Sequence, residues 1–444
     1  MKNTIGIRRE DLSKTGEQRV AITPEAVKSL VQHGHEILVQ PAVHPKTGER
    51  KRAFEDQRYR AAGADIHESL TDANPIFGLK EVEIEQIMPQ KAYLIFSHTH
   101  KGQIKNRKML AHFMEHQNTL IDYELVTHPN RQRIITAFTY FAGYAGMIDS
   151  MWTLGQRYAL RGIEHPFQAI PQSIEKADLA AIKDMVRSCG ERIASSGTPA
   201  ELPPLITVFL GNGKTSTGAQ SIYDLLPVEE IKLSQLAQTF AEGERTKVYK
   251  LILDVPEMYR HKAGKEMDHA AFFQRYLQHP EEFESDMENI FPYASMWMNC
   301  IIWGPEFPRL LTRDMAAAWY KKDQTLEVIG DITCDPEGAI HFSKETWIDE
   351  PVFIYNPATR EQKMGFEGEG IAVMAVTNLP CEFAADASAQ FSADMGELIS
   401  GIASADFKAT NPADAGLPEA IQRAVILWQG KLTPDFAYMQ EYVS

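Results

Sequence analysis

Cysteine is scarce in this sequence, and the cysteines that occur are far apart. There are only four in 444 residues, namely Cys189, Cys300, Cys334 and Cys381. None belongs to a CxxC pair, so neither a structural zinc site nor a dithiol redox motif is predicted. A long chain with so few cysteines is typical of a reducing compartment.

Long apolar runs and an excess of basic residues are also missing. No stretch approaches the roughly 20 apolar residues that a membrane-spanning helix needs. The opening MKNTIGIRRE leads almost directly into an expected strand. We therefore expect no signal peptide, no membrane span and a cytoplasmic location. The net charge is −15, and a field of that sign disfavours binding to nucleic acids and anionic membranes.

The sequence does contain a regular alternation of short apolar runs and amphipathic segments. In the first third, the runs at 4–8, 36–39, 75–79, 92–96 and 119–123 predict strands, separated by stretches of helix length. Strands that alternate with helices predict a mostly parallel α/β sheet.

A second series of the same kind follows. A helix pattern begins near Phe138, and the apolar run LITVFL at 205–210 predicts a buried strand. Strand character returns at 298–303 and 326–335, whereas the polar stretch near 235–295 is expected to leave the sheet. The fold class expected for the chain is therefore α/β with two separate sheets.

The strongest local motif is the glycine-rich turn after the strand at 205–210. It reads GNGKTSTG, with glycines at Gly211, Gly213 and Gly218, and it opens a predicted helix. Glycines in this context permit a tight turn and a close approach of a pyrophosphate to the helix N-terminus. The spacing is GxGxxxxG rather than GxGxxG, so the motif indicates a dinucleotide site through its place between a buried strand and a helix and not through its spacing.

Ionisable residues follow several of the predicted strands. Lys80 and His98 lie just beyond two strand ends, and Arg19, Asp122 and Glu124 lie near other strand boundaries. Ligands collect at the carboxyl ends of parallel strands. Histidine can shuttle protons near neutral pH, and a desolvated lysine can act as a base, which suits condensation of an amine with a carbonyl group.

One further motif has the spacing of a metal site. HFMEH places His112, Glu115 and His116 in the HxxEH pattern of a zinc peptidase. These residues fall largely off the apolar stripe of their helix, so a solvated helix face explains them and we expect no metal.

Several motifs together resemble a known family. IGIRREDLSKTGEQRVAITPEAV, GLKEVEIEQ, LIFSHTHKGQ, LIDYE, AGYAGMID and VFLGNGKTSTGAQSIYDLLP are similar to the lysine–ketoglutarate reductase domain of aminoadipic semialdehyde synthase. More distantly they resemble the lysine-forming saccharopine dehydrogenases and the alanine dehydrogenase/transhydrogenase group. The likeness continues to GKLTP near the C-terminus and so covers essentially the whole chain.

The resemblance implies two Rossmann-like domains, each a mostly parallel sheet with helices on both faces. A catalytic domain would comprise 1–139 and 343–444. A dinucleotide-binding domain would comprise 140–342, with the polar insertion near 235–295. The implied activity is the NADPH-dependent reductive condensation of L-lysine with 2-oxoglutarate to saccharopine.

The resemblance also implies roles for individual residues. Lys80 and His98 would be the catalytic proton-transfer pair. The substrate contacts would be Arg19, Lys101, Gln103, Glu124 and Arg133. The cofactor contacts expected from the resemblance and from the glycine turn are Gly211, Gly213, Thr215, Gly218, Ser234, Cys300, Ile301, Asp331, Ile332, Asn378 and Leu379.

The preference for NADP over NAD depends on where one strand ends. We place the strand after the glycine-turn helix at Glu230–Leu233, which puts Ser234 at its end with Lys232 close by. An acid at that point would favour NAD, whereas a small hydroxyl beside a cation leaves room for a 2′-phosphate. If the strand ends earlier, Glu229 or Glu230 occupies the position and NAD becomes the expected cofactor.

Two alternatives stay open. The same fold could act on another amine and 2-oxo acid, or the chain could be a non-catalytic nucleotide-binding protein. Retention of Lys80, His98 and Arg19 together favours an enzyme. As partners, the resemblance suggests small-molecule substrates and leaves open a separate saccharopine-oxidising enzyme and a homo-oligomer.

Overall fold

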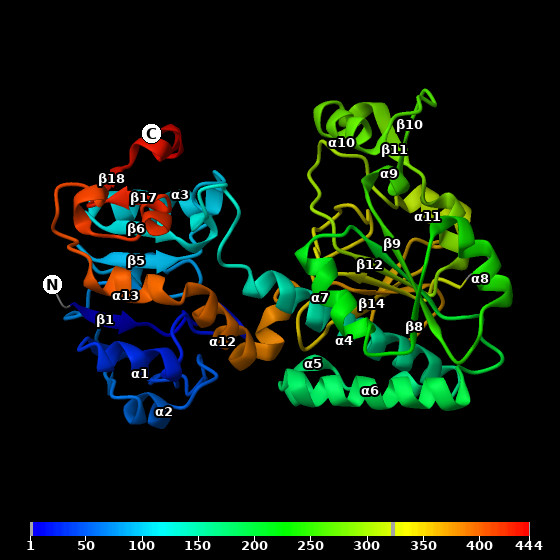
Figure 1. The fold of residues 1–444 in the computed structure, drawn as a ribbon, viewed down its shortest axis with the longest axis horizontal. Coiled ribbons are helices and arrows are strands. Elements are labelled where there is room, and N and C mark those ends of the chain that lie inside the picture. Colours follow the sequence, from blue (N-terminus) through cyan, green and yellow to red (C-terminus); the bar gives the residue numbers. More distant parts are fainter. Residues whose placement is uncertain (1–2, 321–324, 444) are drawn as a thin grey trace. The chain divides into compact units, whose positions relative to one another are not determined.

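The computed structural model describes residues 3–320 and 325–443, which form two compact units. Unit 1 combines Met1–Ala137 with Ala384–Ser444, and unit 2 is Phe138–Phe383. Each unit is built on an eight-stranded, mostly parallel sheet accompanied by helices (Figure 1). The predicted α/β class with two Rossmann-like sheets is thereby confirmed. Among the described residues, no helix is both long and apolar enough to cross a membrane.

The sheet of unit 1 has the strand order β18-β17-β6-β5-β4-β1-β2-β3. Its strands are β1 (Thr4–Ile7), β2 (Glu36–Val39), β3 (Asp65–Ile66), β4 (Ile76–Phe77), β5 (Ala92–Ile95), β6 (Thr119–Asp122), β17 (Val425–Trp428) and β18 (Lys431–Leu432). Its helices are α1 (Pro24–Gln32), α2 (Asp56–Ala61), α3 (Ile104–Glu115), α12 (Ala384–Met395), α13 (Glu397–Ser404) and α14 (Glu419–Gln422). The strands from β1 to β6 are parallel, and β17 and β18 are antiparallel to their neighbours. The chain order reverses between β1 and β4, which is the kind of switch point where α/β sheets bind ligands.

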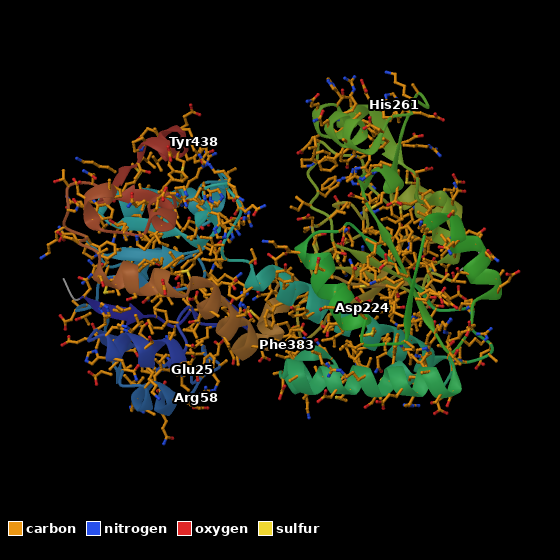
Figure 2. The ribbon with its side chains drawn as sticks, viewed as in Figure 1. Glu25, Arg58, Asp224, His261, Phe383 and Tyr438 are labelled. Atoms are coloured by element: carbon orange, nitrogen blue, oxygen red, sulfur yellow. The ribbon has the colours of Figure 1, made fainter. Side chains whose placement is uncertain are left out.

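The start of α1 shows how local sequence determines these elements. The Thr23 hydroxyl accepts a hydrogen bond from the backbone N–H of Ala26 at 3.4 Å, and Pro24 occupies the first turn. On the solvent side, Glu25 pairs with Arg58 of α2 at 2.6 Å (Figure 2). Both partners are largely exposed, so this ion pair contributes little to stability.

The sheet of unit 2 has the order β15-β14-β16-β13-β12-β7-β9-β8. Its strands are β7 (Ile206–Leu210), β8 (Val228–Ile231), β9 (Val248–Leu253), β12 (Met296–Asn299), β13 (Val328–Asp331), β14 (Val352–Tyr355), β15 (Gln362–Met364) and β16 (Ile371–Met374). Its helices are α4 (Ala137–Leu160, beginning in unit 1), α5 (Ser173–Lys176), α6 (Leu179–Ser196), α7 (Lys214–Tyr223), α8 (Leu236–Glu242), α9 (Val255–Met258), α10 (His269–Gln278) and α11 (Arg313–Trp319). Six strands are parallel, and only β14 and β15 are antiparallel to their neighbours. The switch point of this sheet lies between β7 and β12.

The domain boundary expected at residue 343 is not where unit 2 ends. Strand β16 pairs with β13 through Val328↔Ala372, and β14 pairs with β16, so both strands extend the second sheet. Unit 2 continues to Phe383. Composition could not locate this boundary, because fully buried strands of either sheet consist of the same apolar residues.

The polar insertion expected near 235–295 is also smaller than predicted. Val248–Leu253, inside that range, forms β9, which lies between β7 and β8 in the main sheet. The segment that does leave the sheet comes later. There β10 (Tyr259–His261) and β11 (Phe283–Ser285) form a separate antiparallel pair beside α10 at one end of unit 2, with His261 among its side chains (Figures 1 and 2).

Candidate active site

The catalytic candidates of unit 1 lie beyond the carboxyl ends of β4 and β5. Lys80 follows β4 by three residues, and His98 follows β5 by three residues. The φ angle of His98 is 49°, in the left-handed region that non-glycine residues seldom adopt. Its Nδ1 lies 2.8 Å from Oε1 of Glu81. The ring is thus held both by an unusual backbone conformation and by a carboxylate, as is common at functional sites.

Glu81 is the partner of His98 that the sequence analysis did not single out. It also accepts a hydrogen bond from Nζ of Lys14 at 2.7 Å. Burial opposes its ionisation, but the hydrogen bonds from His98 and Lys14 hold the pKa of Glu81 well below its usual range. Because an ionised carboxylate can only accept, Nδ1 of His98 carries a proton and Nε2 is the nitrogen available for proton exchange. The signal in the sequence was its position directly after Lys80, in GLKE.

Glu10 supports the loop that carries Lys80. Its carboxylate accepts hydrogen bonds from the backbone N–H groups of Leu79 at 2.8 Å and Lys80 at 2.9 Å. The side chain is only 2% exposed. Two buried hydrogen bonds to consecutive amides fix the backbone from which the Lys80 side chain projects.

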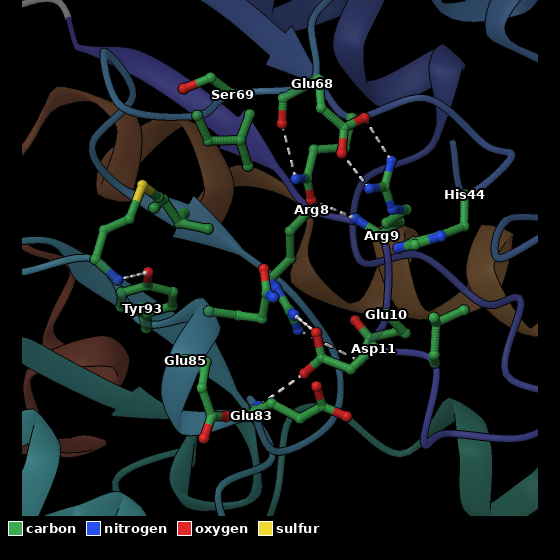
Figure 3. A pocket seen from close by; sticks show the side chains of 16 residues that line it. Arg8, Arg9, Glu10, Asp11, His44, Glu68, Ser69, Glu83, Glu85 and Tyr93 are labelled. Carbon is green, nitrogen blue, oxygen red and sulfur yellow. Dashed lines mark hydrogen bonds and ion pairs between the residues drawn. The ribbon is translucent and has the colours of Figure 1, made fainter. Parts of the chain in front are cut away.

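Glu10 also lines a pocket of about 310 Å³ at the carboxyl end of β1 (Figure 3). In this pocket Arg8 is paired with Asp11, and Arg9 is paired with Glu68, as the dashed lines in the figure mark. The two guanidinium groups are therefore balanced by carboxylates of the same unit, and the pocket is distinct from the Lys80 and His98 pair.

Arg19 has a carboxylate partner within the protein. Its Nε donates to Oε1 of Glu17 at 2.8 Å and its Nη2 donates to Oε2 at 2.6 Å, and both side chains are buried. Burial opposes ionisation of Glu17, but the charge and hydrogen bonds of Arg19, helped by the charge of Lys80, lower the pKa of Glu17 to about 2. The predicted substrate role of Arg19 stays a prediction, since its guanidinium already holds one carboxylate.

Two of the predicted substrate contacts, Lys101 and Arg133, meet at a third, Glu124, and His100 lies beside them. Nζ of Lys101 lies 2.8 Å and Nη2 of Arg133 lies 2.6 Å from Oε1 of Glu124, and Nε2 of His100 lies 3.5 Å from its Oε2. Glu124 is mostly buried directly after β6, whereas Lys101 and Arg133 are exposed. Lys101 and Arg133 both have further N–H donors besides those that reach Glu124, and these donors suit an anionic substrate group. Gln103 is the N-cap of α3 and is exposed.

The glycine-rich turn of unit 2 joins β7 to α7. Gly211 has a φ angle of 94° and donates its N–H to the carbonyl of Leu253 at 2.9 Å. Gly213 is the N-cap of the ten-residue α7, and a Cβ added there would meet nothing within 4 Å. The open space thus lies in front of a helix N-terminus, where the N–H groups and the helix dipole favour a pyrophosphate. Thr215 lies in the first turn of the same helix.

Gly218 explains why α7 can lie so close to its neighbour. A Cβ at Gly218 would be 2.4 Å from the carbonyl oxygen of Tyr140, and one at Gly143 would be 2.1 Å from that of Thr215. Helices α4 and α7 therefore pack backbone against backbone. The turn, the open space and this packing fit a dinucleotide-binding unit.

The remaining predicted cofactor contacts lie at or beyond the carboxyl ends of β12, β13 and β16. They are Cys300, Ile301, Asp331, Ile332, Asn378 and Leu379. Asp331 is buried, accepts a hydrogen bond from Nδ2 of Asn299 at 2.7 Å, and has a pKa raised by burial. Burial likewise raises the pKa of the Cys300 thiol. The parallel register Leu210↔Asn299↔Asp331 puts these positions at the same sheet edge as the glycine turn.

Ser234 does not occupy the position on which the preference for NADP was based. Strand β8 ends at Ile231, and Ser234 lies in a short 3₁₀ helix, η4 (Leu233–Gln235). In addition, β8 is not the neighbour of β7, because β9 lies between them. The residue that follows the true neighbour is Asp254. The argument from Ser234 was wrong because the next strand in the sequence is not the next strand in the sheet.

The HFMEH motif lies on α3 as expected. Ligand atoms of His112, Glu115 and His116 are within 4.8 Å of one another, and the two histidine rings stack at 3.9 Å. The buried residues of α3 include Met109 and Leu110. The motif therefore occupies a face of the amphipathic helix α3 other than its buried face. It is separate in the sequence from Lys80 and His98.

Comparison with known proteins agrees with the motifs. Residues 6–145 match the model of the alanine dehydrogenase/PNT N-terminal domain. Over 98% of its length the chain is 36% identical to alpha-aminoadipic semialdehyde synthase of Arabidopsis thaliana, and it covers 41% of that protein. Against the mitochondrial synthase of Rattus norvegicus the identity is 29%, with 99% of this chain and 48% of that protein covered. The chain thus spans less than half the length of these synthases. Saccharopine dehydrogenase (NAD(+), L-lysine-forming) of Neurospora crassa is 24% identical over 85% of this chain and 86% of its own length.

Solved structures share the fold. An L-alanine dehydrogenase superposes with a TM-score of 0.63 at 18% identity, covering 99% of this chain and all of the other. The transhydrogenase from Sinorhizobium meliloti superposes with a TM-score of 0.58 at 15% identity, covering 97% of this chain and all of the other. Together these matches confirm the resemblance inferred from the motifs: the chain is similar over nearly its whole length to part of the aminoadipic semialdehyde synthases, and it contains an alanine dehydrogenase/PNT N-terminal domain at residues 6–145.

Proposed function

We propose that the chain catalyses the reductive condensation of L-lysine with 2-oxoglutarate to saccharopine, with a reduced nicotinamide nucleotide as the hydride donor. The observation that carries the proposal is the Lys80, Glu81 and His98 group at the strand ends of unit 1. It is supported by the glycine turn of unit 2, which fits a dinucleotide, and by the similarity to proteins named for aminoadipic semialdehyde and saccharopine.

Each residue of this group has a proton-transfer role. Lys80 takes a proton from the ε-ammonium group of lysine, so that the free amine can attack the keto carbon of the oxo acid. His98 exchanges protons through Nε2 as the carbinolamine forms and as water leaves, while Glu81 holds Nδ1. General acid–base catalysis of this kind contributes about 10²–10⁴-fold to a rate. A nicotinamide nucleotide held at the glycine turn of Gly211 and Gly213 would supply the hydride for reduction of the imine carbon.

The cations around Glu124 bind the carboxylates of the substrates in this proposal. Lys101 and Arg133 share a single carboxylate, and both are exposed. Arginine can hold a carboxylate with two parallel hydrogen bonds, whereas lysine acts as a point charge. Arg19 and Gln103 are further candidates for substrate contacts.

The test is oxidation of NADH and of NADPH in the presence of 2-oxoglutarate and a panel of amines, with the product identified by mass spectrometry. We expect oxidation that requires both lysine and 2-oxoglutarate and yields saccharopine. The Lys80→Met variant should lose this activity, and His112→Gln on the outer face of α3 should keep it. Equal or faster oxidation with ammonia or another amine would favour the rival amino-acid dehydrogenase. Nucleotide binding without oxidation in any mixture would favour a non-catalytic protein.

A further inference from the structure

The strand beside the glycine turn ends in an acidic residue. Strand β9 pairs with β7 along its length, from Ile206↔Tyr249 to Leu210↔Leu253. The N–H of Gly211, the first residue of the turn, donates to the carbonyl of Leu253 at 2.9 Å. The next residue after Leu253 is Asp254. The sheet therefore places a carboxylate one strand away from the turn that fits the pyrophosphate.

This position has a known physical consequence in dinucleotide-binding sheets. An acid at the end of the strand next to the glycine-turn strand accepts hydrogen bonds from the hydroxyl groups of the adenosine ribose. Neighbouring strands are about 4.8 Å apart, so the end of β8, with Lys232 and Ser234 beyond it, is about twice as far from β7 as the end of β9. The cation on which a preference for NADP would rest thus lies beyond the carboxylate.

The Asp254 side chain is accessible and has a histidine and a second carboxylate beside it. It is 44% exposed. One oxygen accepts a hydrogen bond from the N–H of Val255 at 2.8 Å, and the other lies 3.2 Å from Nε2 of His269. A second carboxylate, Glu257, accepts the backbone N–H of Asp254 at 2.9 Å. Carboxylates accept hydrogen bonds from hydroxyl groups strongly and repel a phosphate.

We infer that Asp254 binds the adenosine ribose hydroxyls of the nucleotide and makes this chain prefer NADH to NADPH. The inference rests on the proposed nucleotide site and reverses the preference expected from Ser234. The inference makes Asp254 responsible for the discrimination between NADH and NADPH. Replacing Asp254 by Asn removes the charge of this side chain and keeps its shape.

The experiment measures the dissociation constants of NADH and NADPH separately, by nucleotide fluorescence, with the full chain and no substrate. We expect NADH to bind at least about tenfold more tightly, since a hydrogen bond to a charged group and repulsion of the 2′-phosphate act in the same direction. Asp254→Asn keeps an oxygen for the N–H of Val255 and so preserves the start of α9. The variant should bind NADH more weakly and NADPH more tightly, so that the two dissociation constants become similar.

Glu230→Gln is the matched control. Glu230 also carries one negative charge, but it lies within β8, the strand on the far side of β9 from β7, and its side chain is 61% exposed. Its partner Lys250 keeps Asp224 at 2.9 Å, so the variant should leave the ratio of the two constants unchanged.

The outcomes separate this inference from the proposed function. Tighter binding of NADPH by the unmodified chain, or an unchanged ratio in Asp254→Asn, would overturn the role of Asp254 and leave the nucleotide site standing. Binding of neither nucleotide would overturn the proposed function together with this inference. The ratio measured on the unmodified chain decides the preference even if a variant fails to fold.

Discussion

Removing one buried carboxyl group should change how the stability of unit 2 depends on pH. Asp149 on α4 and Glu382 in the 3₁₀ helix η8 (Leu379–Phe383) are both fully buried. Burial raises the pKa of Asp149 to about 6, and burial together with the charge of Asp149 raises the pKa of Glu382 well above its usual range. We therefore expect one proton to remain on this pair of carboxyl groups near neutral pH. The perturbation is Asp149→Asn, which keeps an oxygen for the N–H of Ser173 that Asp149 accepts at 2.9 Å.

The sign and size of the effect follow from proton linkage. Both groups have a higher pKa in the folded than in the unfolded chain, so their stabilising contribution is full at low pH and is lost as the pH rises through the folded values. For Asp149 the rise is from 3.8 to about 6. Each pKa unit corresponds to about 1.4 kcal/mol. Ionisation of Asp149 should therefore lower the free energy of unfolding by about 3 kcal/mol as the pH rises from about 4 to above 6. Asp149→Asn should abolish that loss and gain about 3 kcal/mol relative to the unmodified chain by about pH 7.

The assay is urea unfolding followed by tryptophan fluorescence at a series of pH values, with the difference between variant and unmodified chain as the readout. Taking the difference removes the groups with lowered pKa, such as Glu17, whose contribution has the opposite sign. Asp184→Asn on α6 is the control, because that carboxylate is 78% exposed. If Asp149→Asn and the unmodified chain lose stability in parallel across this window, Asp149 is not a buried group with a raised pKa and the reasoning fails.

Lys80→Met and His98→Gln should each lower turnover by about 10²–10⁴-fold with an unchanged circular dichroism spectrum; near-normal rates in both would remove their assigned roles. Arg19→Ala should cost about 3–5 kcal/mol in urea unfolding, because it leaves the buried Glu17 carboxylate without its guanidinium. Adding Glu17→Gln should restore much of that loss, and unchanged stability of the single variant would contradict the argument. Gly213→Ala should fold normally, since a Cβ there meets nothing within 4 Å. It should nevertheless weaken nucleotide binding measurably in a fluorescence titration, and unaltered affinity would show that the pyrophosphate does not approach this glycine.

The sequence could predict the features that depend on the local pattern of residues. Strand β2 was expected at its observed residues, and β7 with its glycine turn was expected within one residue. Lys80 and His98 could be paired in advance because both follow strands of a parallel sheet, and such strands end at one edge. Cys300 and Asp331 were expected as cofactor contacts from the family resemblance alone, and the parallel register now puts them at the same end of the sheet as Gly211.

The order of strands within a sheet does not follow from the local pattern of residues. The chain places β8 at the edge and returns with β9 beside β7, a skip that periodicity does not reveal. Because of this skip, the residue that follows the strand beside β7 is Asp254 and not Ser234. The sequence could not predict the ion-pair partners either. Glu17 pairs with Arg19 and Glu81 pairs with His98, and both contacts are defined only by the folded chain.

The discontinuity of unit 1 has a consequence for how the protein is made on the ribosome. Unit 2 is continuous in the chain, whereas unit 1 needs residues 384–444 to complete its sheet. Until that segment emerges, β6 is an open edge, because its neighbour β17 has not been synthesised. Phe391, whose ring lies 5.0 Å from that of Tyr123 at the end of β6, is missing as well. Domains fold as units during synthesis, and an unpaired strand edge invites pairing with other chains. We therefore expect unit 2 to fold before unit 1 is complete. We expect the exposed edge of β6 to need protection by a chaperone during synthesis.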